Sequence, residues 1–344
     1  MNRYVNRYVR ENISRAMYMT CAAITIVLMA LIFYFIGSRA YQTFTDHGVN
    51  PVDFFIGTHY DPRGGHVGAF ALLAGSFLVT VFAVLVSAPI SVGVAVFISE
   101  MAPAWARSFM QPVLELFLGI PSIIYGFLGL VILVPAIAHV YNALAGAYLY
   151  NGYGLPAAAL VLAIMILPTV TTISADAIRG LPGGLREASA AVGATRWQTI
   201  TRTLIPAATP GILTGVILGT GRAIGETLAV SFVIGGNPNQ LPFAFSNYFP
   251  YLTFNSTSSV TVQLLFDFFE VKQGDLDYDA LWTLAFILLL ITVLLVIASR
   301  TVAARSAFVV RQQRDRRGSG WRRFLPGGRG VAIPVPATPV ASAQ

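Results

Sequence analysis

The chain of 344 residues is too apolar and too sparsely charged to be an ordinary soluble protein. Hydrophobic residues make up 56% of it and charged residues 11%, whereas soluble domains carry about 25% charged residues. Asp, Glu, Lys and Arg are absent from residues 67–99 and 116–175. Apolar stretches longer than about 20 residues have the length of bilayer-spanning helices. The composition therefore excludes a soluble enzyme or binding module and indicates an integral membrane protein.

The apolar stretches predict an all-α membrane protein with six transmembrane helices. Their approximate ranges, in chain order, are Met17–Ile36, Val67–Phe97, Phe109–Ala136, Leu155–Ile173, Thr209–Val233 and Leu281–Ala298. The second and third are longer than one bilayer crossing needs, and each contains helix-breaking residues, such as Pro89 and Pro121. We expect both to be tilted and kinked. A pair of shorter helices in each run is the alternative.

Basic residues are segregated to one side of these spans. Four arginines precede the first span, one follows the second, four lie in the segment 179–202 and nine follow the last span. The opposite side carries only Arg39, Arg63 and Lys272. Because cytoplasmic loops are enriched in Lys and Arg, both termini and the segment 179–202 are predicted to be cytoplasmic. The net charge of +7 then reflects contact with anionic lipids of the bilayer, not nucleic acid.

The outer loops carry mostly acidic charge: Asp46, Asp53, Asp61, Asp267, Glu270, Asp275, Asp277 and Asp279. The loop 235–280 is long enough to hold a short helix around Val260–Glu270. Either of the two larger outer loops can meet an extracytoplasmic partner or act as a plain solvated connection.

The chain divides into three parts. Residues 1–16 form a cytoplasmic N-terminal segment, residues 17–298 form one six-helix membrane domain, and residues 299–344 form an arginine-rich tail whose last 25 residues are expected to be disordered. The first apolar run is read as an uncleaved span, because it is too long for a signal peptide core. Cys21 is the only cysteine, so no internal disulfide or cysteine metal cluster can form.

A polar segment, EASAAVGATRWQTITRTLIP at 187–206, interrupts the apolar pattern. Glu187 suits the first turn of a short helix ending near Val192, because a carboxylate complements the helix dipole there. Gly193 allows a turn and a close approach by another surface. A second amphipathic helix, Ala194–Leu204, places Trp197, Ile200 and Leu204 at spacings of three and four, and Pro206 starts the fifth span. The physics alone allows either a docking knob or an amphipathic loop on the membrane.

The spacing of this segment resembles the signature loop of bacterial ABC importer permeases. That pattern is Glu-Ala-Ala, three residues, Gly, nine residues, then Ile-x-Leu-Pro. Here Glu187, Gly193 and Pro206 are in register, with Ser189, Thr203 and Ile205 as similar substitutions. The resemblance implies a type I ABC importer permease fold with a coupling loop at about 176–206. Residues Glu187, Ala188, Gly193, Ala194, Trp197 and Pro206 would contact the ATPase.

Four further segments are similar to the phosphate-specific ABC permeases and, within them, to the C-type (PstC-like) subunit. They are residues 51–62, 75–103, 114–135 and 211–236. The stretch GRAIGETLAVSFVIGG is closer to the C-type than to the A-type subunit, which continues differently after the shared Arg-Ala-Ile-Gly-Glu-Thr. The first outer loop and the arginine-rich tail depart from the pattern.

This resemblance implies a multi-pass protein of the bacterial inner membrane that is a transport subunit and not an enzyme. Its expected partners are an A-type permease subunit in a heterodimer, a cytoplasmic ABC ATPase dimer and an extracytoplasmic phosphate-binding protein. ATP and Mg would bind to the ATPase, and this chain would bind no cofactor. In agreement, the sequence has no Gly-x-x-x-x-Gly-Lys-Ser/Thr loop.

Charges inside the predicted spans are the candidates for the solute path. Arg222 lies in the fifth span, with Glu226 expected one turn later on the same face. A charge at that depth costs about 2.5–3.5 kcal/mol on insertion scales, so it faces the bundle interior. One reading is a structural ion pair; the other is that Arg222 attracts an oxyanion, since its donor fork matches two oxygens.

Glu115 is a second charged candidate, either on the path, paired with Arg222, or simply interfacial. Ser122, Tyr125 and Thr227 can add neutral hydrogen bonds. Gly211, Gly215 and Gly219 recur every four residues and predict close helix packing. The sequence therefore favours an ATP-driven phosphate importer. Alternatives are a permease for molybdate, sulfate or phosphonate, an ion-coupled carrier or channel, and a membrane enzyme, for which no catalytic constellation is present.

Overall fold

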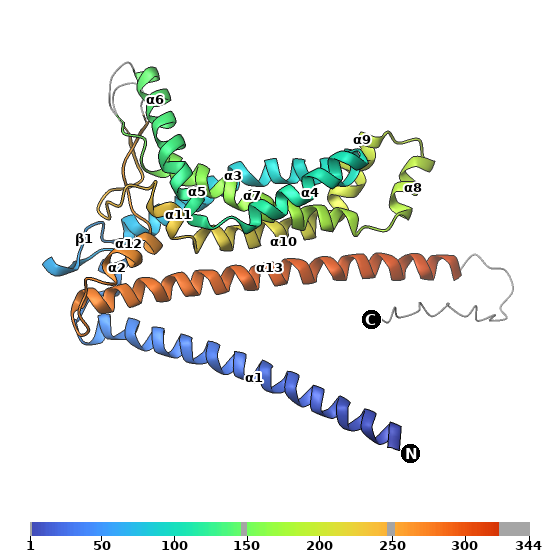
Figure 1. The fold of residues 1–344 in the computed structure, drawn as a ribbon, viewed down its shortest axis with the longest axis horizontal. Helices are drawn as coiled ribbons and strands as arrows, with labels where there is room; N and C mark the ends of the chain where they lie inside the picture. Colours follow the sequence, from blue (N-terminus) through green and yellow to red (C-terminus); the bar gives the residue numbers. More distant parts are fainter. Residues whose placement is uncertain (1, 146–149, 246–251, 323–344) are drawn as a thin grey trace.

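The computed structural model describes residues 2–145, 150–245 and 252–322. The long helices run lengthwise through the molecule, with α8 and α9 at one end and α2, β1 and α12 at the other (Figure 1). We call these the α8–α9 end and the α2–α12 end. The long helices are α1 (Asn2–Thr45), α3 (Phe70–Val96), α4 (Ala104–Gly119), α7 (Leu155–Arg179), α10 (Ile205–Ile224) and α13 (Leu276–Arg322).

Shorter helices and two strand pairs fill the connections. The α-helices are α2 (Pro51–Ile56), α5 (Ser122–Leu128), α6 (Val134–Ala145), α8 (Gly184–Ala191), α9 (Arg196–Thr199), α11 (Leu228–Ser231) and α12 (Val260–Asp267). A 3₁₀ turn, η1 (Pro62–Gly64), and three π-helical segments, η2 (Phe97–Met101), η3 (Gly129–Leu133) and η4 (Ile200–Leu204), complete them. The antiparallel pairs join β1 (Tyr60–Asp61) to β2 (His66–Val67) and β3 (Phe243–Phe245) to β4 (Leu252–Phe254). The predicted helix around Val260–Glu270 is confirmed as α12.

Six helical stretches in the described residues are long and apolar enough to cross a membrane, as predicted. They are Ser14–Thr45, Phe70–Met101, Ser122–Ala145, Leu155–Arg179, Arg196–Ile224 and Leu276–Ala298. The second run is one continuous helical stretch despite Pro89.

The predicted start of the third span at Phe109 is wrong. The helix α4 ends at Gly119, and Ile120 and Pro121 adopt extended ψ angles of 127° and 136°. Proline disfavours helical geometry in the residue before it, so the chain breaks there and the span begins at Ser122. This run therefore holds two helices, which was the alternative reading of the sequence.

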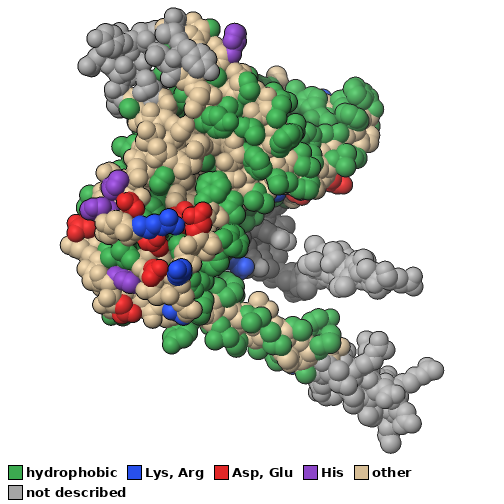
Figure 2. Space-filling model, turned by 60° about the vertical axis from the view of Figure 1, so that its left-hand side comes forward, with side chains coloured by type: hydrophobic (Ala, Val, Ile, Leu, Met, Phe, Trp, Pro, Cys, Tyr) green, Lys and Arg blue, Asp and Glu red, His purple; other side chains and the backbone are tan. Residues whose placement is uncertain are grey.

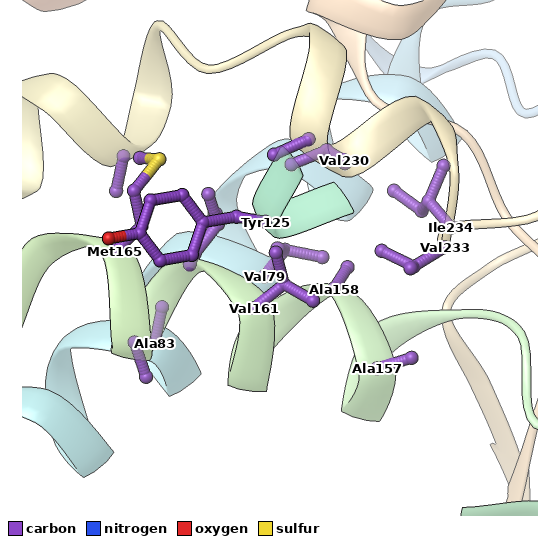
Figure 3. Close-up of a cluster of buried hydrophobic side chains, with 14 of the residues drawn as sticks. Val79, Ala83, Tyr125, Ala157, Ala158, Val161, Met165, Val230, Val233 and Ile234 are labelled. Atoms are coloured by element: carbon purple, nitrogen blue, oxygen red, sulfur yellow. The ribbon is translucent and has the colours of Figure 1, made fainter. Parts of the chain in front are cut away.

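The core is built around α7, whose apolar window is 67% buried, the largest share among the six spans. Val161, Leu162 and Met165 of α7 pack with Val79 of α3 and Val230 of α11. Figure 3 shows this cluster, with the Tyr125 ring lying among the same side chains. The chain segments that carry the candidate path residues thus meet on one central helix.

The glycine series of α10 allows that helix to pack closely on α7, as predicted. A Cβ atom placed on Gly211 would clash with the Cβ of Ala177, and one on Gly219 would lie 2.7 Å from Cγ2 of Val170. At Gly215 the corresponding distance to Ile173 is 3.2 Å. Small residues let helix backbones approach in membranes, where dispersion contacts supply much of the association energy.

We expect Gly211→Ala to destabilise the protein, because the added methyl overlaps Ala177 and overpacking costs about 1–3 kcal/mol. Gly221→Ala is the matched control on the same helix, since a Cβ there meets nothing within 4 Å. The control should leave stability unchanged or raise it by about 0.5–1 kcal/mol through helix propensity. Thermal unfolding in detergent measures both, and equal midpoints for the two variants would contradict the packing role.

Helix α1 contacts the rest of the described protein near the α2–α12 end. Thr43 shares a hydrogen bond of 2.8 Å with Thr283, and Phe35 packs edge-on against Trp282 at 5.3 Å between ring centroids. Towards its N-terminus α1 diverges from α13 (Figure 1). Its apolar window has no buried residue within the protein, as expected for a segment solvated by lipid.

The last helix continues past Ala298 to Arg322, so the first part of the arginine-rich tail is helical. The predicted disorder falls mainly on residues 323–344, outside the described residues. The start of α1, the far end of α13 and the α8–α9 loop lie at the same end of the molecule (Figure 1). Assignment of that end to the cytoplasm stays a prediction from charge.

Candidate functional site

The fifth span ends earlier than its apolar pattern predicts. Helix α10 ends at Ile224, Gly225 is its C-cap, and α11 begins at Leu228. The predicted span Thr209–Val233 and the placement of Glu226 one helical turn after Arg222 are therefore wrong. The break is stabilised locally: a Glu226 carboxylate oxygen accepts a hydrogen bond of 3.2 Å from the backbone N–H of Ala229, and so caps the new helix.

A second hydrogen bond holds the break from outside the span. The Thr261 hydroxyl, near the start of α12, donates to the Glu226 carbonyl at 3.0 Å. Because helix ends leave carbonyl groups without intrahelical partners, the Thr261 hydroxyl supplies the hydrogen bond that the Glu226 carbonyl lacks within the helix. A small cavity of about 10 Å³ lies here, with a lining that is part apolar, such as Val79 and Leu162, and part polar: Ser76, Thr80, Glu226, Ser259 and Thr261.

Sequence reasoning missed the hydroxyl groups around the break. The available signal was the run Asn255-Ser-Thr-Ser-Ser-Val-Thr261 in an outer loop that the sequence left open as a partner contact or a solvated connection. Thr257, Ser258, Ser259 and Thr261 are all at least 95% buried. Buried hydroxyls need hydrogen-bond partners, so this run was a marker of a loop that folds back into the protein.

Arg222 lies close to the end of α10 and is half-buried. Its Nη1 donates to the Thr169 hydroxyl on α7 at 3.3 Å. Within the described part of the chain, Arg222 forms no ion pair with Glu226 or Glu115. Neither of the two pairings considered for Arg222 from the sequence is formed, and its positive charge has no carboxylate partner there.

Tyr125 is buried, and its hydroxyl donates to the Phe117 carbonyl at 2.8 Å. This bond crosses the break between α4 and α5 and satisfies a carbonyl at the end of α4. Ser122 begins α5 and is half-buried, and Glu115 is exposed on α4. Thr227 is half-buried before α11 and lines an apolar groove between α12 and α13. The structure thus buries Tyr125 and leaves Glu115 on the surface.

The signature segment forms two helices joined at a glycine, as predicted. Gly193 has a φ of +79°, and a Cβ there would meet nothing within 4 Å. Across the turn, the Ser189 and Thr199 hydroxyls share a hydrogen bond of 2.8 Å. Thr195 and Gln198 form a capping box at the start of α9. These bonds hold α8 and α9 in one geometry around an open glycine turn.

The outer surface of this loop carries most of the residues proposed for docking. Glu187, Ala188, Gly193, Trp197 and Pro206 are exposed, and Ala194 is half-buried. The predicted common face of Trp197, Ile200 and Leu204 is wrong. Ile200 and Leu204 are buried, whereas Trp197 is 63% exposed. Ile200 and Leu204 pack in the cluster with Ala175 and Ile178 of α7 and Ala208 and Ile212 of α10, and Trp197 is not part of it.

An ion pair fastens the loop to the membrane helices. Arg186 contacts Glu100 at the end of η2, with Nη2 2.5 Å and Nε 3.2 Å from its carboxylate. The same guanidinium donates to the carbonyl of Ile178 in the last turn of α7 and to that of Leu181 just after the helix. Hydrogen bonding to Glu100 raises the pKa of Arg186 above its usual value. Neither residue was singled out from the sequence, although Glu100 is the only carboxylate between Asp61 and Glu115.

Comparison with known proteins assigns the family. The profile described as "Binding-protein-dependent transport system inner membrane component" matches residues 87–308. The probable ABC transporter permease protein YqgH of Bacillus subtilis is 38% identical over 302 residues, covering 87% of this chain and 93% of that protein. The chain belongs to the inner-membrane permease family of binding-protein-dependent transport systems.

Other relatives of this permease have a named cargo. The phosphate transport system permease protein PstC of Haemophilus influenzae is 30% identical and covers 88% of this permease and 96% of its own length. PstC 1 of Mycobacterium tuberculosis is 31% identical, with 78% of each chain covered. This chain is thus a multi-pass inner-membrane permease subunit of an ABC importer, a transport component and not an enzyme.

In this permease we expect Glu100→Gln to loosen the α8–α9 loop, because Arg186 then loses its charged partner. The control is Glu115→Gln on α4, whose exposed carboxylate forms no ion pair among the described residues. Hydrogen exchange at the backbone amides of α8 should become about tenfold faster or more in Glu100→Gln, since charge-assisted bonds are worth about 1.5–3 kcal/mol. Unchanged exchange in Glu100→Gln would show that the pair does not hold the loop.

Proposed function

We propose that this chain is the C-type permease subunit of an ATP-driven inorganic phosphate importer. The observation that carries the proposal is Arg222. It is a half-buried guanidinium next to the break in a membrane-spanning helix, and it has a hydroxyl partner but no carboxylate partner in the described residues. Charges inside membranes are costly and mark ion pathways. An oxyanion offsets this charge and matches the guanidinium geometry.

The relatives support phosphate as that oxyanion. Proteins that bear the name phosphate transport system permease are 30–31% identical to this chain over most of its length. The sequence segments similar to the C-type subunit include the stretch that carries Arg222 and the break after it. Molybdate, sulfate and phosphonate remain the competing cargoes, because YqgH, which is 38% identical, has a name that specifies no cargo.

The family supports an assembly with an ATPase and a binding protein. The chain would pair with an A-type permease subunit and dock through Glu187, Ala188, Gly193, Ala194, Trp197 and Pro206 onto a cytoplasmic ATPase dimer, which binds ATP and Mg. An extracytoplasmic phosphate-binding protein would deliver the solute to the opposite face. Closure of the ATPase would then favour one permease conformation over another. The Arg186–Glu100 pair links the docking loop to the ends of α3 and α7, so it would carry this motion into the bundle.

In this mechanism Arg222 lowers the energy of the anion as it passes the break in the fifth span. Thr169 orients the guanidinium from α7, and Glu226 is held away from it by capping α11. With its carboxylate engaged at Ala229, Glu226 does not neutralise Arg222. A guanidinium alone, without further donors closing around the anion, attracts the solute without trapping it.

Phosphate uptake into vesicles that contain the whole assembly tests the proposal. We expect Arg222→Ala to lose at least about tenfold in uptake, since a charged hydrogen bond contributes about 1.5–3 kcal/mol, while ATP hydrolysis continues. Arg222→Lys should retain part of the uptake, because it keeps the charge but not the donor fork. Arg300→Ala is the control, an exposed arginine on α13.

Two results would contradict the proposal in different ways. Undiminished uptake in Arg222→Ala removes Arg222 from the path and leaves a structural role. Absence of phosphate uptake by the intact assembly, with uptake of molybdate or sulfate in the same vesicles, changes the cargo and keeps the importer.

A further inference from the structure

The α2–α12 end carries a small acidic cleft away from the candidate path. It has a volume of about 230 Å³ and is lined by Tyr60, Asp61, Pro62, Arg63, Gln263, Asp267, Glu270, Val271 and Asp277. Figure 2 shows acidic and basic side chains gathered on this end of the molecule. Pockets for drug-sized ligands measure roughly 300–1,000 Å³, so this cleft suits a single side chain or a small ion.

The charges of the cleft favour a cation. Four carboxylates face one guanidinium, that of Arg63. Arg63 contacts Glu270 at 3.3 Å and Asp277 at 3.4 Å, and Arg63 and Glu270 are each about two-thirds exposed. Exposed pairs of this kind contribute little to stability and can exchange partners. The excess of negative charge disfavours an oxyanion, so the cleft does not belong to the solute path.

Two buried polar atoms in the wall have no hydrogen-bond partner in the described structure. Tyr60 and Gln263 are 4% and 7% exposed, and the Tyr60 hydroxyl and the Gln263 carbonyl oxygen make no hydrogen bond in the described structure. The Gln263 amide nitrogen is already used, since it donates to Asp267 at 2.6 Å. Buried polar atoms without partners are rare and costly. The Gln263 oxygen can only accept, and the Tyr60 hydroxyl can accept as well as donate, so a donor that enters the cleft from outside would satisfy both.

The arrangement does not suit a metal ion. No group of three His, Cys, Asp or Glu side chains in the described part of the chain stands close enough to hold one. An ammonium or guanidinium group tolerates dispersed acceptors, because it carries three to five separate N–H donors. A lysine or arginine side chain therefore fits the cleft better than a divalent cation.

We infer that this cleft receives a lysine or arginine side chain of the extracytoplasmic binding protein and so fixes its orientation on the permease. The inference rests on the proposed function, which supplies that partner. The cation would displace part of the contact between Arg63 and Glu270 and donate to Asp267, Tyr60 and Gln263. Complementary charge at such a site steers association and sets the register of docking.

The test measures binding of the purified binding protein to the complete permease–ATPase assembly in lipid nanodiscs. Asp267→Asn removes one negative charge and keeps an oxygen that can accept from Gln263. Burial raises the pKa of Asp267, so its charged form is disfavoured in the folded protein and the neutral amide is expected to be tolerated. Asp46→Asn is the matched control, an exposed carboxylate of the first outer loop that does not line the cleft.

We expect the Kd of Asp267→Asn to rise about tenfold or more in about 50 mM NaCl, and the difference to shrink in about 500 mM NaCl because salt screens the attraction. Tyr60→Phe should also weaken binding by about tenfold. In the free assembly its thermal unfolding midpoint should stay unchanged or rise, because the hydroxyl has no partner there. If Tyr60 had only a structural role, Tyr60→Phe would lower the unfolding midpoint of the free assembly and leave the Kd for the binding protein unchanged.

Several results would overturn the inference. Kd values within about twofold of the unmodified assembly for both cleft variants would do so. An equal rise in Kd for Asp46→Asn would also do so, because it would show an effect of general surface charge and not of the cleft. Stabilisation of the unmodified assembly, but not of Asp267→Asn, by Mg²⁺ or Ca²⁺ without the binding protein would place a metal in the cleft instead.

Failure of the proposed function is recognised separately. If the binding protein docks with the expected dependence on Asp267 but no phosphate enters the vesicles, the cargo is wrong and the docking cleft stands. If the binding protein does not dock on the unmodified assembly at all, both the partner assignment and the cleft inference fall.

Discussion

The architecture depends on how this protein supplies hydrogen-bond partners to backbone N–H and C=O groups where a membrane helix is interrupted. Lipid offers no hydrogen bonds, so an irregular segment at membrane depth is stable only where protein groups supply them. At the end of α10, the Glu226 carboxylate accepts a hydrogen bond from the Ala229 N–H, and the Thr261 hydroxyl donates one to the Glu226 carbonyl. The Tyr125 hydroxyl does the same for Phe117 between α4 and α5. At each break, side chains supply the hydrogen bonds that the interrupted helix lacks.

This requirement explains why polar side chains cluster near the breaks. Ser76, Thr80, Ser259 and Thr261 surround Glu226, and Thr169 meets Arg222 from the central helix. Groups that stabilise the interruption also make its surroundings polar enough to accommodate a charge. A fully apolar bundle would exclude Arg222, whereas this one offers it a hydroxyl and leaves its charge uncompensated by any described carboxylate.

Rigidity at the α8–α9 end has a different basis. The loop is held by a charge-assisted pair from Arg186 to Glu100, by the bonds from Arg186 to the end of α7, and by the hydroxyl bridge across Gly193. Arg107 adds bonds to the carbonyls of Ile98 and Ser99 where η2 ends α3. These contacts lie at the ends of the apolar spans Phe70–Met101 and Leu155–Arg179, and they connect the loop to the two helices that form the core.

The sequence by itself determined the number of spans, the charge asymmetry, the glycine face of α10 and the two-helix loop around Gly193. These are local or periodic properties: apolar length, small residues every four positions, and a glycine where positive φ is needed. The tertiary structure alone decided that the fifth span ends at Ile224, because Thr261, far along the chain, satisfies the Glu226 carbonyl at that break. The break after Gly119 instead follows a local signal, Pro121. The tertiary structure also decided that Arg222 meets Thr169 and not Glu226, that Arg186 meets Glu100, and that Trp197 faces outwards. Arg222 and Thr169, like Arg186 and Glu100, are separated by many positions, and no local pattern encodes such contacts.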